Sequence, residues 1–290
     1  MPVGVVDVGS NTVRLLLAQG DDEVLSMRET LGLGECVERV GCIPVQKLHE
    51  TAATVTAFVD AAWAAGATEL EILITSPGRQ ASNGVELLDA IQASAAAPAR
   101  ILSADEEGRL AFAGAVASVG GPPGRRIAVV DVGGGSAQVV TGSRRGGADW
   151  LRSIDLGSRR LTSRLLSADP PGDDAIASAR AEVERLLGHF HPPEPRTVLA
   201  VGGSARALRR LVGSRLGRDE LAEATAILGR TPRSELIRRY DINPLRAATL
   251  VGGTVILTVL QQHLDTPMKV VRAGLRDGAL LQLEARREAA

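Results

Sequence analysis

The sequence predicts an α/β protein made of two similar domains. Its 290 residues suit two domains of roughly 100 to 200 residues each. Short runs of β-branched residues alternate with longer segments of helical periodicity, which is typical of α/β folds. The tripeptide Asp7-Val8-Gly9 ends the first apolar run, and Asp131-Val132-Gly133 follows a matching run in the second half. We therefore expect an internal duplication.

The first domain begins with a hairpin, in which strands 3–6 and 13–18 flank a polar turn that contains glycine. From Leu48 to Gly66, apolar residues recur every three or four positions, as in an amphipathic helix. Ser103 begins another helix because Glu106 completes the spacing of a capping box. The remaining expected elements are strand 70–74, helix 85–95, strand 99–102 and the helix from 103 to about 118.

Glycines and prolines at 120–124 interrupt regular structure, and we place the domain boundary there, with domains 1–121 and 122–290. The second domain repeats the hairpin and adds further helices. Its expected elements are strands 127–130 and 137–141, a helix between the proline-rich stretches 169–172 and 191–195, strand 197–201, a helix beginning at 202, helices 218–228 and 244–264, strand 268–271 and a helix from 275.

The composition excludes several classes of protein. Apolar residues make up 44% of the chain, charged residues 23%, and the formal net charge is -1. This balance is typical of a globular protein and gives no overall field that would attract nucleic acid or a membrane. The longest apolar run, 250–260, is shorter than the roughly 20 residues of a membrane span. Because no signal-peptide pattern precedes the first strand, we expect a cytoplasmic protein with Cys36 and Cys42 as free thiols in a loop.

The Asp-Val-Gly turns indicate phosphate binding. Backbone N–H groups of glycine can close around phosphate oxygens, while an aspartate at the strand end holds a divalent cation. Each turn alone could equally be an ordinary hairpin, in which glycine only supplies a positive φ. Two such turns after matching strands, together with a third strand-Gly-Gly-helix segment at 201–206, favour phosphate binding.

Seven segments, in order, carry a resemblance to a known family: DVGSNTVRLLLA from Asp7, TSPGRQASNG from Thr75, LSADEEGRLAF from Leu102, VVDVGGGSAQVV from Val129, LGSRRLT from Leu156, VGGSARALRRL from Val201 and AGLRDG from Ala273. The chain resembles the exopolyphosphatase and guanosine pentaphosphate phosphohydrolase family, in a short two-domain form. The resemblance implies two ribonuclease H-like domains of the actin-like ATPase type, with a phosphate-binding cleft between them.

The resemblance also implies roles for individual residues. Magnesium, or manganese in its place, would be held by Asp131 with Gln138 beside it. Glu106 would activate the attacking water, and Arg79 would contact phosphate, as would Arg160 in the LGSRRLT segment. The residues that would bind the substrate phosphates are Asp7, Gly9, Ser10, Asn11, Gly133, Gly134, Gly135, Ser136, Gly202 and Gly203.

Three features complicate these roles. The capping box would occupy the carboxylate of Glu106, which leaves Glu107 as an alternative base. The family pattern has a glutamate where Gln138 stands, and an amide supplies no charge to a metal. Pro77-Gly78 also departs from the pattern before Arg79.

The resulting hypothesis is a magnesium-dependent hydrolase that removes the terminal phosphate of short inorganic polyphosphate or of guanosine pentaphosphate. The departures from the family pattern keep a second hypothesis open, a sensor that binds polyphosphate or a guanosine alarmone without rapid hydrolysis. A third is an ATP-dependent small-molecule kinase, which the EEGR and LGSRRLT segments disfavour. We expect neither nucleic acid nor a membrane as partner, and a homodimer is compatible with the sequence.

Overall fold

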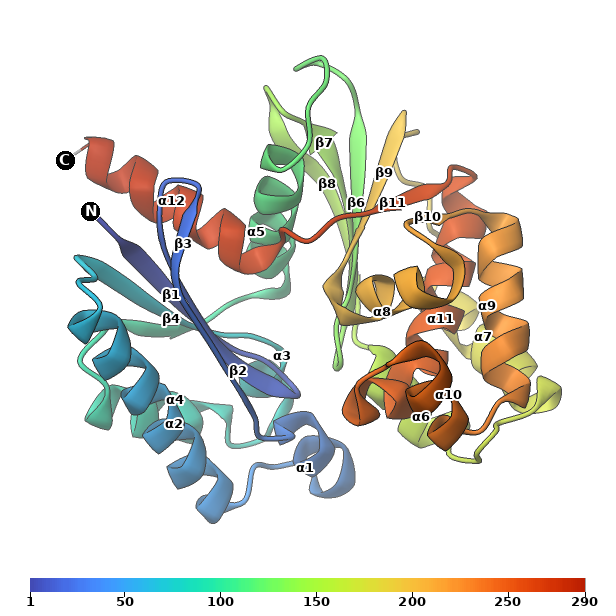
Figure 1. Cartoon of the computed structure of the whole chain (residues 1–290), viewed down its shortest axis with the longest axis horizontal. Coiled ribbons are helices and arrows are strands. Elements are labelled where there is room, and N and C mark those ends of the chain that lie inside the picture. The colour runs from blue at the N-terminus through green and yellow to red at the C-terminus, as the bar shows by residue number, and fades with distance from the viewer. Residues whose placement is uncertain (290) are drawn as a thin grey trace. The chain divides into compact units, whose positions relative to one another are not determined.

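The computed structural model describes residues 1–289, and contacts between residues divide the chain into two compact units (Figure 1). The first unit comprises residues 1–110 and the C-terminal segment from Leu275, and the second comprises 111–274. This division differs from the domains expected from the sequence. The helix α5 begins in the first unit and ends in the second, and the last helix packs on the first sheet.

The first unit contains a five-stranded mixed sheet in the order β3-β2-β1-β4-β5. The first three strands are antiparallel, and β4 and β5 run parallel to β1. The elements are β1 (Val3–Val8), β2 (Thr12–Gln19), β3 (Asp22–Thr30), α1 (Leu33–Val40), α2 (Val45–Ala64), β4 (Glu69–Ile74), α3 (Ser76–Gln80), α4 (Gly84–Ser94), β5 (Ala99–Ile101), α5 (Ala104–Ala117) and α12 (Leu275–Ala289).

Alternation along β1 divides its side chains between two cores, because successive residues of a strand point to opposite faces. Val6 and Val8 pack with α2 and α4, whereas Val3 and Val5 pack with α12. Asp7 shares the face of Val3 and Val5 by the same alternation. The cysteine expectation was half right: both thiols are free, but Cys36 lies in α1 and not in a loop.

The second unit repeats this plan with a six-stranded sheet in the order β10-β11-β9-β6-β7-β8. Strands β6, β7 and β8 are antiparallel, and β9 is parallel to β6. The elements are β6 (Ile127–Val132), β7 (Ala137–Ser143), β8 (Gly147–Ile154), α6 (Ser158–Leu165), α7 (Asp173–Leu187), β9 (Thr197–Val201), α8 (Gly202–Val212), β10 (Arg215–Leu216), α9 (Arg218–Arg230), α10 (Arg233–Tyr240), α11 (Pro244–Leu264) and β11 (Met268–Val270).

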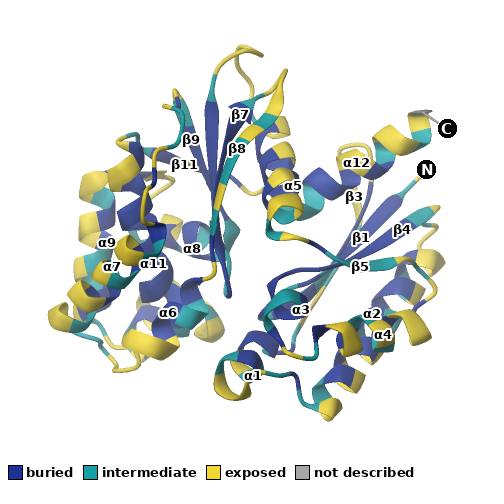
Figure 2. Cartoon of the chain, turned by 180° about the vertical axis from the view of Figure 1, so that it is seen from behind, coloured by how far each residue is buried: buried dark blue, intermediate teal, exposed yellow. Residues whose placement is uncertain are grey.

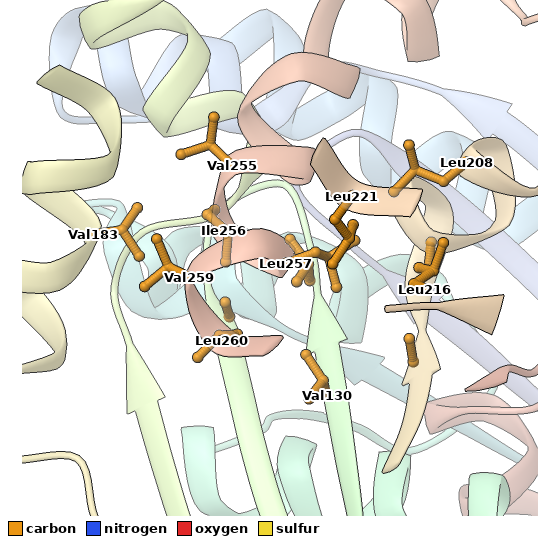
Figure 3. Packing of buried hydrophobic residues seen from close by; sticks show 14 of the residues in the cluster. Val130, Val183, Leu208, Leu216, Leu221, Val255, Ile256, Leu257, Val259 and Leu260 are labelled. Atoms are coloured by element: carbon orange, nitrogen blue, oxygen red, sulfur yellow. The ribbon is translucent and has the colours of Figure 1, made fainter. Parts of the chain in front are cut away.

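The helix α11 forms the centre of the second core. Its apolar side chains pack against Val183 of α7, Leu221 of α9 and Val130 of β6 (Figure 3), and the helix is dark along most of its length in the burial view (Figure 2). By length and composition α11 could cross a membrane, but 78% of its apolar window is buried inside the protein. It is therefore a core helix.

Candidate active site

The first glycine turn is held by backbone bonds on both sides. Gly9 donates its N–H to the carbonyl of Thr12 at 3.0 Å, which closes the hairpin between β1 and β2. The carbonyl of Ser10 accepts from the N–H of Gly34 at 2.6 Å, and that of Asn11 accepts from the N–H groups of 31 and 32. The start of α1 therefore fixes this turn. The sequence pattern gives no indication of this role for α1.

The side chains of this turn are also engaged. The hydroxyl of Ser10 is buried and lies 2.6 Å from that of Ser76, the first residue of α3. Asp7 stands opposite Arg14 in the β1–β2 register. The pKa of Asp7 is raised, chiefly because the surrounding protein removes water from the carboxylate, although Arg276 and Arg14 pull the pKa down. Asp7 thus lies among cations, where a metal ion is disfavoured.

Arg79 lies on α3 and is fixed by two contacts. Its guanidinium forms an ion pair with Glu107 at 2.7 Å and donates to the carbonyl of Leu102 at 2.8 Å. The side chain of Glu107 is only 12% exposed. Gly78, which belongs to the Pro77-Gly78 departure from the family pattern, has a packing role, because a Cβ on it would lie 2.8 Å from the side chain of Ile74. That departure from the family pattern therefore need not weaken the site.

Glu106 caps α5, as the spacing predicted. Its carboxylate accepts from the N–H of Ser103 at 2.8 Å, and its own N–H donates to the Ser103 hydroxyl at 3.1 Å. The other carboxylate oxygen binds Arg100 at 2.7 Å, and the side chain is 48% exposed. The pKa of Glu106 is lowered, mainly by the hydrogen bond from the Ser103 backbone. Both oxygens of Glu106 are thus engaged by the helix cap and by Arg100, whereas Glu107 is the carboxylate that contacts Arg79.

The second glycine turn is tied to the start of α6. The carbonyl of Gly133 accepts from both the N–H and the hydroxyl of Ser158, at 2.9 and 3.0 Å. The carbonyl of Gly134 accepts from the N–H of Arg159 at 3.0 Å. In a trans peptide the N–H points away from the preceding carbonyl. The N–H groups of Gly134 and Gly135 therefore point to the side opposite α6, as an anion-binding turn requires.

Two glycines let the neighbouring backbone approach this turn and Asp131. A Cβ on Gly157 would lie 2.5 Å from the backbone of Gly134. Gly202, the first residue of α8, has φ +89°, and a Cβ there would lie 2.9 Å from a carboxylate oxygen of Asp131. The Asp131 side chain thus lies at the N-terminus of α8, where backbone dipoles favour anions.

Gln138 is 1% exposed and stands opposite Asp131 in the β6–β7 register. Its amide N–H donates to the buried hydroxyl of Ser136 at 3.1 Å. No group of three or more His, Cys, Asp or Glu side chains suited to a metal occurs among residues 1–289. Mg²⁺ is commonly held by one or two carboxylates together with waters and substrate phosphates. Asp131, with the oxygens of Ser136 and Gln138 nearby, fits that mode of binding.

Residues of α11 that the sequence pattern does not reveal also support this turn. A Cβ on Gly252 would lie 2.5 Å from the carbonyl of Ser158, and Gly253 has no room for a Cβ beside the hydroxyl of Ser204. The glycine pair therefore lets α11 contact the first turns of α6 and α8. Arg246 of α11 lies over Gly203, which likewise has no room for a side chain. Such close approaches between residues distant in the chain cannot be predicted from the spacing of residues in a single sequence.

Arg160 does not extend from the site as a phosphate contact would. Its guanidinium binds the backbone carbonyl of Asp155 at 2.9 Å and the carboxylate of the same residue at 2.8 Å. Arg160 therefore holds the segment before α6. A role toward phosphate would require this pair to open.

The fold and the glycine turns define the class of protein: two ribonuclease H-like units of the actin-like type, each with an Asp-Val-Gly hairpin. The model of the Ppx/GppA phosphatase family matches residues 18–287, and the chain belongs to this family. Exopolyphosphatase 1 of Mycobacterium tuberculosis is 27% identical, over 97% of this chain and 88% of that protein. Exopolyphosphatase 2 of the same species is 28% identical, over 90% of each chain.

Solved structures agree with the fold. An exopolyphosphatase-like protein superposes with a TM-score of 0.88 at 25% identity and covers 99% of both chains. The Ppx/GppA family member of Aquifex aeolicus superposes with a TM-score of 0.85 at 23% identity, over 99% of this chain and 98% of that one. The expected fold and family are thus confirmed.

Proposed function

We propose that this protein is a Mg²⁺-dependent phosphohydrolase that removes the terminal phosphate from short inorganic polyphosphate or from guanosine pentaphosphate. The observation that carries the proposal is the second glycine turn. Its carbonyls are bound by α6, its N–H groups point to the opposite side, and Asp131 lies beside it at the start of α8. Family membership and the two exopolyphosphatase relatives support the same reaction. We infer that the protein acts in the cytoplasm.

The chain's own residues divide the work of hydrolysis. Backbone N–H groups of the turns bind phosphate oxygens, and Asp131 with Gln138 and Ser136 would hold Mg²⁺, which supplies positive charge to the phosphates. Glu107 takes the proton of the attacking water, because it is a buried carboxylate whose position is set by Arg79. Arg79 contributes charge near the transferred phosphate.

A sensor without rapid turnover is the second candidate, and Gln138 is the observation that favours it. Where the family pattern has an acid, the amide of Gln138 is bound to Ser136. Asp131 is then the carboxylate on which metal binding depends, so affinity for Mg²⁺ should be lower than with two carboxylates.

The test is phosphate release from polyphosphates of graded length and from guanosine pentaphosphate, with and without Mg²⁺, beside the binding affinity for each. Release that depends on Mg²⁺ and on Glu107 supports the hydrolase. Tight binding without release, in wild type and Glu107→Gln alike, supports the sensor. Transfer of phosphate from ATP to a small molecule would instead indicate a kinase.

A further inference from the structure

Two ion pairs in series connect the first sheet to the start of α5. Glu71 lies on β4, which is flanked by β1 and β5, and its side chain is only 9% exposed. One of its carboxylate oxygens accepts from Nε of Arg100 on β5 at 2.7 Å. Nη1 of Arg100 donates to a carboxylate oxygen of Glu106 at 2.7 Å. Glu106 is therefore tied to a strand inside the sheet as well as to the helix that it caps.

The direction of Glu106 constrains the direction of its neighbour. Because an α-helix has 3.6 residues per turn, adjacent side chains project about 100° apart. Glu106 projects toward Arg100, and Glu107 projects toward Arg79. A rotation of the first turn of α5 would therefore move both carboxylates. The capping hydrogen bonds lie at the exposed Ser103, where water competes with them, so the contact with Arg100 adds resistance to such a rotation.

Stability does not account for the pair of Glu71 and Arg100. The second carboxylate oxygen of Glu71 is buried and has no hydrogen-bond partner among residues 1–289. Such an oxygen is unfavourable, and the free energy of removing a carboxylate from water often exceeds the attraction within the ion pair. Apolar side chains of similar volume can replace buried ion pairs with little loss of stability, or with a gain. What this pair provides is a fixed place for the guanidinium that holds Glu106.

We propose that Arg100, anchored by Glu71, is a positioning residue that directs the carboxylate of Glu107 toward the attacking water. This role rests on the function proposed above, in which Glu107 takes the proton of that water. Arg100 keeps Glu106 in the helix cap, so that one of two adjacent carboxylates is occupied and the other is presented in a defined direction. A general base must lie within hydrogen-bond reach of the proton that it removes, and a displacement of about 1 Å can lower the rate about a hundredfold.

The double variant Glu71→Leu/Arg100→Met tests this role, because it replaces the ion pair by apolar side chains. Phosphate release is measured with Mg²⁺ and the better wild-type substrate of tripolyphosphate and guanosine pentaphosphate. kcat should fall about tenfold or more while KM changes less than about twofold, since the base is displaced and the substrate contacts are kept. The melting temperature should not fall, whereas loss of a merely structural pair would lower it.

Two single variants accompany the double variant. Arg100→Lys keeps a cation beside the buried Glu71, so folding is preserved, but an ammonium lacks the planar set of donors with which a guanidinium binds two carboxylates. Its kcat should lie between those of wild type and the double variant. Lys47→Met is the control, because it removes a salt-bridge partner of similar exposure on α2 and should leave kcat unchanged.

Two further measurements connect the effect to Glu107. In a Glu107→Gln background, the double variant should lower kcat no further, because residues that act as a unit have non-additive effects. A crystal structure of the double variant, which requires no turnover, should show that Glu107 has left its 2.7 Å contact with Arg79. Retention of that contact, an undiminished kcat, or an equal loss of kcat with and without Glu107 would overturn the role of Arg100. If wild type releases no phosphate, the proposed function fails instead, and the crystal structure still decides whether Arg100 positions Glu107.

Discussion

The two Asp-Val-Gly turns share a backbone design but differ in charge. In each unit the turn follows a central strand, and its carbonyls accept N–H groups from the start of the helix after the third strand, α1 or α6. The residue opposite the aspartate differs: Arg14 faces Asp7, and Gln138 faces Asp131. The two units thus share the backbone support of the turn, whereas the cation opposite Asp7 agrees with our proposal that Asp131 is the metal ligand.

The largest expected effect tests this difference directly. Asp131→Ala should reduce Mg²⁺-dependent phosphate release by about a thousandfold or more, because several kcal/mol of charge stabilisation disappear with the metal. Asp7→Ala should reduce release far less and should leave half-saturation by Mg²⁺ nearly unchanged. Phosphate release across a Mg²⁺ titration measures both. Equal shifts of Mg²⁺ half-saturation in the two variants would contradict the asymmetry between the turns.

The next effect concerns the neighbouring carboxylates of α5. Glu107→Gln should lower the rate by about a hundredfold, since the general base is lost. Glu106→Gln keeps an oxygen to accept from Ser103 and should lower the rate only severalfold at most. Single-turnover phosphate release from polyphosphate, with melting temperature as control for folding, compares the two. A rate loss confined to Glu106→Gln would restore the assignment that the family pattern gives.

Gln138→Glu tests whether the missing negative charge at position 138 is the only feature in which the second turn falls short of the family pattern. The new carboxylate would stand opposite Asp131, so half-saturation by Mg²⁺ should fall severalfold, or turnover should rise. Binding of polyphosphate without Mg²⁺ should weaken through repulsion. If turnover stays absent at saturating Mg²⁺ while binding weakens, the sensor hypothesis gains over the hydrolase. Arg14→Glu, the matching change in the first turn, should not alter Mg²⁺ half-saturation.

The contacts that hold the two turns also differ, and stability measurements can separate them. A Cβ on Gly157 would meet the backbone of Gly134 at 2.5 Å, whereas one on Gly34 would meet the side chain of Ser10 at 2.9 Å. The approach at Gly157 is the closer of the two, so Gly157→Ala should destabilise by about 1 to 3 kcal/mol and Gly34→Ala by less. Chemical denaturation provides the comparison. A larger loss for Gly34→Ala would place the tighter clamp in the first unit.

The sequence predicted the elements that carry strong apolar patterns and missed those that do not. The bounds of α11 were predicted in full, because the apolar run 250–260 is preceded by Pro244, a residue suited to the first turn of a helix, and followed by Asp265. The edge strands β3 and β8 were not predicted, since most of their residues are partly or fully exposed and give no apolar alternation. The helices α1, α6 and α10 were missed because each has only eight residues, which is too short for a helical period to be recognised.

The site shows a similar limit. The Asp-Val-Gly turns were found because glycine and aspartate recur after matching strands, and the capping box of Glu106 was found from spacing alone. The partner of Arg79 could not be chosen, because Glu106 and Glu107 are adjacent in sequence and only the direction of α5 decides which one meets the guanidinium. Gly252 and Gly253 contact residues that are far away in the sequence, and no local pattern indicates such contacts.

The smallest expected effect concerns the charge of Asp7. Its pKa is raised in the folded protein, chiefly by loss of water around the carboxylate, so the folded state binds a proton more tightly than the unfolded chain. The stability contribution of Asp7 therefore falls as the pH rises from the unfolded pKa through the folded one.

Above this window the charged carboxylate is unfavourable, and Asp7→Asn should raise the melting temperature by about 1 to 3 °C at pH 7. At a pH below the unfolded pKa of 3.8 the difference should vanish, because Asp7 is then protonated in both states. Melting curves of wild type and Asp7→Asn between pH 3 and pH 8 measure this. A variant less stable than wild type at pH 7 would show that attraction to Arg14 and Arg276 outweighs the loss of water around Asp7. The two turns would then differ less in charge than the residues opposite their aspartates, Arg14 and Gln138, indicate.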